Sequence, residues 1–276
     1  MDWDRAKNLT IIFMLLLNIF LGVLIYIFSE KYVLNSEQET NIIKVLSQNN
    51  IAVYTEIPKS YRPMNQILMS TPEYNMNLLI DILFEEQEAV RQTIEMDKII
   101  FKDDVSELTL QNNFITFTSR VDGITTREEA RRYARNIIDK ASGMFNGFEF
   151  HGSTESENGI LLEYYQRYGK SIIYSNYLKF FFSTDGRLEI NFFYNPPDRY
   201  EDDTIKILSA DEALFLLMGH INDMNYDVFI TGIDIVYYQD TLLKAVPYYR
   251  IYVLNKREPV LVNAVTGIVK NHAENS

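Results

Sequence analysis

Residues 126–130 (TREEA) and residues 209–213 (SADEA) share one pattern, which is a hydroxyl residue, any residue, an acid, Glu and Ala. In both stretches Glu follows the hydroxyl residue by three positions. This is the spacing of a capping box, in which the two side chains satisfy each other's backbone N–H groups at a helix start. Each stretch therefore predicts the beginning of a helix, and together they indicate an internal repeat.

Three extended segments follow each motif, and all are rich in β-branched and aromatic residues. They are residues 160–168, 177–183 and 188–194 after the first motif, and residues 230–238, 248–254 and 259–265 after the second. Residues 184–187 (TDGR) are a hairpin-turn signal, and a Gly follows each motif Ala at a similar chain distance. The markers of the repeat are Thr126, Glu129, Ala130 and Gly186 in the first copy, and Ser209, Glu212, Ala213 and Gly267 in the second.

A helix followed by strands has a simple packing logic. Leu188, Ile190 and Phe192 alternate along one strand and form an apolar face that the apolar stripe of the preceding helix can cover. The prediction is an α+β protein in which two repeated units each combine a helix with an antiparallel sheet. Whether the two units pack in tandem or share a sheet stays open.

The chain before the repeat is less regular. The pattern from Ser36 to Glu39 resembles a capping box and predicts a helix that starts at Ser36 and stops at Asn49-Asn50. The remaining expectations are a strand over 51–57, a loop over 61–71, a helix over 75–88 and extended chain over 106–119. Consecutive prolines and acids after Asn195 indicate a linker.

An uncharged run from Leu9 to Phe28 predicts a transmembrane helix. At about 1.5 Å per residue, a helix of this length matches a hydrocarbon core of about 30 Å. A cleaved signal peptide and a buried core helix are the alternatives. The run is long for a signal peptide, and the charged residues Glu30 and Lys31 stand where a small-x-small cleavage site is needed.

Basic residues around the run set its expected orientation. Arg5 and Lys7 precede it, whereas Lys31 alone follows closely, which places the N-terminus in the cytoplasm and the large domain outside the cell membrane. The predicted organisation is a cytoplasmic stub (1–8), a transmembrane helix (9–28), an N-terminal extracytoplasmic segment (29–120), a first α+β unit (121–197), a linker (198–207) and a second α+β unit (208–276).

One face of the predicted transmembrane helix differs from the rest. Asn18 carries a carboxamide, which is costly in hydrocarbon without a hydrogen-bond partner, and Gly22 one turn later permits close approach of another helix. The alternative is that Asn18 bonds its own helix backbone. The predicted partner-binding face consists of Asn18, Gly22, Ile11, Met14, Leu15, Leu21 and Ile25.

Composition excludes several function classes. The chain has 276 residues, 47% of them hydrophobic, a net charge of −12 and no Cys. The acidic balance argues against nucleic-acid binding, and the absence of Cys removes thiol nucleophiles and all-Cys zinc sites. The three His residues have no metal-ligand spacing, and no nucleophile elbow or phosphate-binding Gly-rich loop is present. We expect no catalytic residues, metal or cofactor.

Both ends of the chain carry a family resemblance. The opening residues 1–7 (MDWDRAK), residues 17–21 (LNIFL) within the apolar run, and Asn50-Ile51 leading into a strand that ends at Ile57-Pro58 resemble the YycI (WalI) family of regulatory membrane proteins. Near the C-terminus, residues 247–253 (PYYRIYV) and 262–267 (VNAVTG) are similar to that family's last strands, which are themselves reminiscent of PepSY-type modules. The resemblance covers essentially the whole chain.

The resemblance implies a non-enzymatic regulator. Members of this family are single-pass proteins that act with a YycH-type protein on the sensor histidine kinase YycG (WalK), whose response regulator (YycF, WalR) controls cell-wall metabolism. The implied partners are this kinase, the YycH-type protein and membrane lipid. Two other readings stay open: a secreted or anchored protein-binding module unrelated to a kinase, and a membrane-anchored hydrolase. The sign of any effect on the kinase does not follow from the sequence.

Overall fold

The computed structural model describes residues 3–221, 227–241, 243–256 and 258–270. The chain forms a mixed α+β structure that begins with one long apolar helix, α1 (Trp3–Glu30). It divides into two compact units. Unit 1 contains the described residues of Met1–Met64, Thr204–Ile235 and Tyr248–Ser276, and unit 2 contains those of Asn65–Asp203 and Val236–Pro247. The chain therefore passes twice from unit 1 into unit 2 and back.

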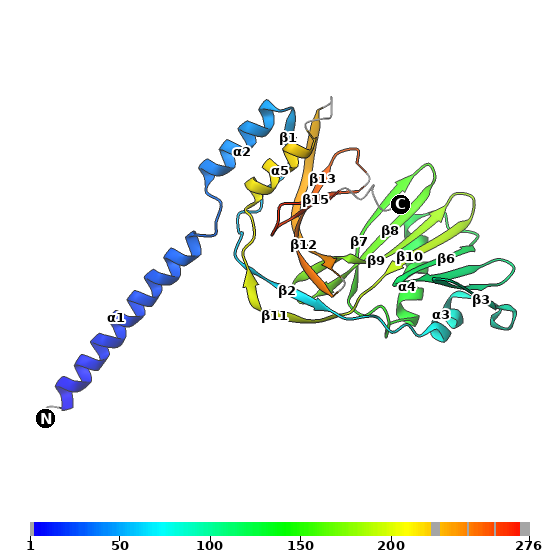
Figure 1. Ribbon diagram of the computed structural model, residues 1–276, viewed down its shortest axis with the longest axis horizontal. Coiled ribbons are helices and arrows are strands. Elements are labelled where there is room, and N and C mark those ends of the chain that lie inside the picture. Colours follow the sequence, from blue (N-terminus) through cyan, green and yellow to red (C-terminus); the bar gives the residue numbers. More distant parts are fainter. Residues whose placement is uncertain (1–2, 222–226, 242, 257, 271–276) are drawn as a thin grey trace. The chain divides into compact units, whose positions relative to one another are not determined.

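Unit 1 combines three helices with short ladders of strands. Besides α1, its elements are α2 (Ser36–Gln48), β1 (Ile51–Val53), α5 (Ala210–Ile221), β14 (Val260–Asn263), β15 (Val269–Lys270) and the outer parts of β12 (Val228–Thr241) and β13 (Lys244–Val253). Strand β1 pairs in parallel with the start of β12, and β13, β14 and β15 pair antiparallel in that order. Helices α2 and α5 pack side by side (Figure 1).

The core of unit 1 lies where α2 and α5 contact its strands. Helix α5 buries Ala213, Leu214 and Leu217 at the spacing of one helix face. Strand residues such as Ile251 and Val262 lie in the same cluster. This burial removes apolar surface from water, which is the main contribution to the stability of the unit.

Unit 2 is a large sheet covered by helices. Its elements are β2 (Met64–Met69), α3 (Met76–Leu83), a short 3-10 helix η1 (Gln87–Ala89), β3 (Arg91–Glu95), β4 (Lys98–Lys102), β5 (Glu107–Gln111), β6 (Phe114–Arg120), α4 (Arg127–Lys140), β7 (Phe148–Ser156), β8 (Gly159–Tyr168), β9 (Ser171–Ser183), β10 (Arg187–Phe193) and β11 (Pro197–Ile205). Neighbouring strands run in the order β11-β2-β13-β12-β9-β10-β6-β5-β4-β3, and β7 and β8 extend from β9.

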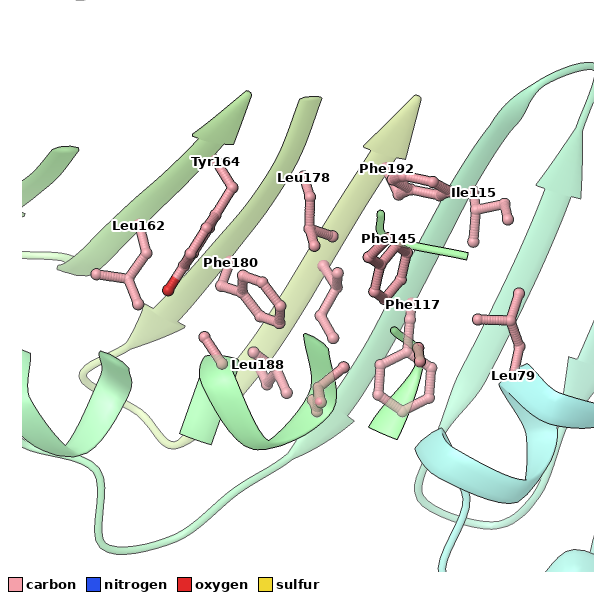
Figure 2. Packing of buried hydrophobic residues seen from close by; sticks show 14 of the residues in the cluster. Leu79, Ile115, Phe117, Phe145, Leu162, Tyr164, Leu178, Phe180, Leu188 and Phe192 are labelled. Atoms are coloured by element: carbon pink, nitrogen blue, oxygen red, sulfur yellow. The ribbon is translucent and has the colours of Figure 1, made fainter. Parts of the chain in front are cut away.

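One face of this sheet carries the core of unit 2. Along β9, Leu178, Phe180 and Phe182 point into the cluster, and Leu162 of β8 and Phe192 of β10 join them (Figure 2). Helix α4 covers this face with the small residues Ala130 and Ala134, which let the helix approach the strands closely. The alternation of buried and half-buried residues along β9 and β10 is that of a sheet with one covered face.

Much of the predicted secondary structure is confirmed. Helices begin right after Thr126 and after Ser209, and the extended segments that follow each motif overlap β8, β9, β10, β12, β13 and β14, although three were expected to continue beyond Phe193, Val253 and Asn263. Residues 106–119 form the hairpin of β5 and β6. The predicted turn at residues 184–187 joins β9 to β10, with Gly186 at φ 81°.

Four expectations before and between the motifs are corrected. Helix α2 does begin at Ser36, but its cap is Asn35, which exchanges hydrogen bonds with Gln38. The strand expected over 51–57 is only β1, and the helix expected over 75–88 ends at Leu83. Strand β2 lies inside the predicted loop 61–71.

The segment predicted as a linker is a strand. Residues Pro197–Ile205 form β11, at one end of the strand order, where a proline as first residue costs no ladder hydrogen bond. The number of strands after each motif is larger than the three predicted. In the described residues, β7, β8, β9, β10 and β11 follow α4, and β12, β13, β14 and β15 follow α5. Gly186 and Gly267 each lie between the third and fourth strand after their helix.

Candidate functional site

Helix α1 is long and apolar enough to cross a membrane. The window Ala6–Ile25 has a mean hydropathy of 2.5, and none of it is buried against the rest of the described chain. A core helix of a soluble protein is buried, so this exposure contradicts the reading of the segment as a core helix. Large apolar side chains such as Phe13 (63% exposed) are left without cover from this chain.

The polar side chain in the middle of α1 points outward. Asn18 is exposed, and within the described residues its carboxamide makes no hydrogen bond. The alternative in which Asn18 bonds its own helix backbone is therefore not the arrangement found here. Thr10, two turns earlier, does make such a bond, because its hydroxyl donates to the carbonyl oxygen of Ala6 at 2.9 Å.

Several predicted face residues come together on the helix surface. A shallow, open groove is lined by Thr10, Ile11, Met14, Leu15, Asn18 and Ile19. It contains four of the predicted residues, whereas Leu21, Gly22 and Ile25 lie outside it, farther along the helix. Thr10 and Ile19 were missed, although each lies four residues from a predicted residue, Thr10 from Met14 and Ile19 from Leu15. At Gly22 nothing lies within 4 Å of an added Cβ, so the surface there is open.

The repeat markers occupy helix starts. Thr126 caps α4 in a full capping box with Glu129. Hydrogen bonds from the backbone of Thr125 and from Thr126 hold the pKa of the Glu129 carboxyl below its usual range. At the second motif, Glu212 accepts hydrogen bonds from the Ser209 backbone N–H at 2.8 Å and from its hydroxyl at 3.0 Å. These residues fix helix boundaries.

The small residues of the motifs are in the cores. Ala130 is completely buried and Ala213 is 1% exposed. Gly267 has a φ of 76°, and an added Cβ would lie 2.7 Å from Cδ1 of Leu216 on α5. The second motif thus places its helix close to the turn between β14 and β15.

Replacing Ala213 by Leu is expected to lower the free energy of unfolding by about 1–3 kcal/mol, because the added methylenes have no space in a packed core. The measurement is denaturant unfolding of the full chain in detergent. Ala89→Leu, at an exposed position of η1, is the matched control and should change little. Equal effects of both substitutions would contradict the close packing of α5.

The histidines lie in ordinary surroundings. His151 lies in strand β7, where its ring packs edge-on against Tyr165 at a centroid distance of 5.1 Å. His220 is in the last turn of α5, and His272 lies outside the described residues. In the described part of the chain, no three His, Asp or Glu side chains form a metal-binding group.

Comparison with known proteins gives a fold. No family model matches the chain, and no curated protein matches its sequence. An uncharacterized protein from Eubacterium rectale ATCC 33656 is 10% identical, with a TM-score of 0.52, and the match covers 80% of this chain and 90% of that one. The C-terminal domain of Bacillus megaterium YpeB is 12% identical, with a TM-score of 0.41, over 73% of this chain and 97% of that domain. The first likeness shows a similar fold and nothing more.

Proposed function

We propose that this chain is a non-enzymatic, membrane-anchored regulator of a sensor histidine kinase that controls cell-wall metabolism, and that it acts together with a YycH-type partner. The proposal is supported by the resemblance of the two chain ends to the YycI family. It includes a single pass of α1 through the cell membrane, with the N-terminus in the cytoplasm, and a PepSY-like C-terminal unit. The segments beginning with α4 and α5 are, in this proposal, two copies of one unit.

The observation that carries the proposal is the exposed carboxamide of Asn18 on the groove of α1. In the hydrocarbon core no water is present to satisfy this group, and no residue in the described part of the chain satisfies it. A second transmembrane helix that offers a donor or acceptor removes the cost, and the groove gives its side chains a place to pack. We therefore assign this face of α1 to contact with a helix of the kinase or of the YycH-type partner.

The route of regulation follows from the position of the anchor. In this proposal both compact units lie outside the membrane, so an effect of these units on a kinase passes through the bilayer or through extracytoplasmic contacts. A contact in the bilayer is weak by itself, since interhelical polar contacts contribute only about 0.6 kcal/mol on average. Such a contact shifts the equilibrium between two states of the kinase if the contact is stronger in one state than in the other.

Asn18→Leu is expected to weaken the complex by about 0.6 kcal/mol, and by at most about 2 kcal/mol, because one interhelical hydrogen bond is lost. Membrane insertion and the fold of the two units should not change. Partners are first identified by affinity capture from detergent-solubilised membranes. Crosslinking yield and kinase output then measure the variant, at partner levels below saturation.

Two controls separate the groove from general hydrophobicity. Ile12→Val and Leu16→Val alter the opposite side of α1 and should be nearly neutral. In the double variant Asn18→Leu/Leu16→Asn the helix keeps its composition but presents the amide on the wrong side, and binding should stay weak. Full binding in the double variant, or unaltered signalling after replacement of the whole span by an unrelated apolar helix, would reject this role for α1.

A further inference from the structure

Two segments far apart in sequence are joined directly after helix α1. We call them the juxtamembrane clip, defined as residues 31–34 and 57–62. The backbone N–H of Leu34 donates to the carbonyl oxygen of Lys59 at 2.8 Å, and that of Tyr61 donates to Tyr32 at 3.0 Å. Val33 and Ser60 form an isolated β-bridge between these bonds. The clip thus holds residues 57–62 against the first residues that follow the helix.

Side chains reinforce this junction. The hydroxyl of Tyr61 donates to the carbonyl oxygen of Lys31 at 3.0 Å, and the rings of Tyr32 and Tyr61 meet edge-on with centroids 5.9 Å apart. Leu34 and Ile57 are buried in the core of unit 1 and anchor both segments to it. Val33, in contrast, is 40% exposed. The clip is therefore a fixed structure with an apolar residue on its surface.

The covalent connection places the clip at the membrane surface. The predicted span ends at Phe28 and the helix ends at Glu30, so residues 29 and 30 extend roughly 3 Å beyond the hydrocarbon. The polar headgroup layer on each side of a bilayer is about 5–8 Å thick. Lys31 lies at this depth, and the hydrogen bonds made by residues 31–34 bring residues 59–61 to the same level. In membrane proteins, Tyr is enriched at this membrane–water interface.

The charge of the clip is opposite to that of the whole chain. Its charged residues are Lys31, Lys59 and Arg62, and it contains no Asp or Glu, whereas the chain carries a net charge of −12. Lys59 is 58% exposed and also pairs with Glu39 at 3.3 Å, so Lys31 and Arg62 provide the less engaged charges. Lys31 lies over the ring of Tyr32, 5.6 Å from its centroid.

We propose that the juxtamembrane clip binds the phosphate groups of anionic phospholipids in the leaflet where α1 emerges. Lys31, Lys59 and Arg62 contact the headgroups, and Tyr32, Tyr61 and Val33 lie at the interface beneath them. This contact fixes the height and tilt of unit 1 above the bilayer. This proposal rests on the membrane span of α1, which is part of the proposed function. It does not depend on contact with a kinase, so either proposal can be rejected without the other.

The test uses the full-length chain with Ser60→Cys as its single cysteine, because the natural sequence has none. A nitroxide label at this position is studied in nanodiscs of phosphatidylcholine alone or of an equimolar mixture with phosphatidylglycerol. The experiment measures which labels a water-soluble nickel chelate can reach. The result is given as the ratio of shielded labels to accessible labels. This ratio should rise in the anionic nanodiscs and fall again at high sodium chloride concentration.

Variants that remove the basic residues of the clip test whether these residues cause the shielding of the label. A Lys or Arg near an anionic surface contributes about fivefold in affinity, so Lys31→Gln/Lys59→Gln/Arg62→Gln should lower the anionic-lipid ratio by more than about tenfold. Lys31→Arg/Lys59→Arg keeps the charge and should keep the ratio, which guards against a loss caused by misfolding. The matched control, Arg132→Gln/Arg135→Gln/Lys140→Gln, removes three exposed charges from α4 and should have no effect.

Three outcomes would overturn the proposal. The first is equal accessibility in neutral and anionic nanodiscs. The second is an equal loss in the α4 control, which would indicate a general charge effect. The third is a shift produced by inorganic phosphate in neutral nanodiscs, which would indicate a site for free anions instead of a lipid surface.

Discussion

Phe180→Ala is expected to lower the free energy of unfolding by about 3–5 kcal/mol, one of the two largest effects that we foresee in this chain. Phe180 is completely buried on β9. Leu162 of β8 and Ile190 of β10 lie opposite it in the ladders, and the ring of Tyr164 meets it edge-on at 5.9 Å (Figure 2). Truncation would leave a cavity between three strands and helix α4 that the rigid sheet does not close.

The adjacent residue provides the control for this prediction. Phe181 has the same side chain but points to the opposite face of the sheet, where it is only half-buried. Phe181→Ala should therefore cost about 1 kcal/mol, the typical value for a point substitution. Both variants are compared by denaturant unfolding of the full chain in detergent, followed by tyrosine fluorescence. Equal losses would mean that the two faces of β9 are equally packed, contrary to the structure.

Gly159→Ala is expected to cost about 3–5 kcal/mol as well, because steric overlap and backbone strain act together. Gly159 begins β8 with a φ of 145°, a conformation that residues with a side chain rarely adopt. An added Cβ would overlap the carbonyl oxygen of Phe182 and lie 2.9 Å from its carbonyl carbon. Both atoms belong to the backbone of β9, so relief requires a shift of the ladder.

Gly152→Ala is the matched control for this substitution. Gly152 lies in β7, the strand that pairs with β8, and an added Cβ there has nothing within 4 Å. The change should be within about 1 kcal/mol and can be stabilising, because Ala restricts the unfolded chain. Thermal unfolding of both variants measures the difference in their stability. A tolerated Gly159→Ala would show that the β7-β8 hairpin is not held against β9 as described.

Local chemistry explains which elements the sequence predicted well. The hydrogen bonds of Thr126 with Glu129 and of Ser209 with Glu212 span only three residues, so their pattern alone indicates a helix start. The same locality explains the error at α2. Asn35 with Gln38 and Ser36 with Glu39 are two overlapping capping patterns, and the structure uses the first.

The missed strands depend on distant partners. Strand β2 follows Pro63 and has little alternation of its own, yet it pairs with β13, through Ile67 and Ala245, far along the chain. Strand β11 is acidic and begins with Pro197, features typical of linkers, and is a strand because β2 lies beside it. Such pairing is not encoded within a short window of sequence.

Part of the predicted face of α1 coincides with the groove. Spacing from Asn18 identifies Ile11, Met14 and Leu15 as neighbours on the surface of α1, and the groove contains all four. The juxtamembrane clip was not predicted, because nothing in residues 57–62 indicates that they lie against residues 31–34. Two of its hydrogen bonds join backbone groups, which leave no signature in the sequence, and the third, from the Tyr61 hydroxyl, ends on a backbone carbonyl oxygen.

The discontinuous composition of unit 1 has a consequence for biosynthesis. Helix α2 and strand β1 leave the ribosome early, but the surfaces that bury Leu46 and Ile51 belong to α5, β12 and β14, near the other end of the chain. The part nearest the anchor therefore cannot complete its core until these later elements have been synthesised. A polypeptide interrupted before β14 would leave the core around α2 incomplete, so burial of α2 depends on the synthesis of strands more than 200 residues later.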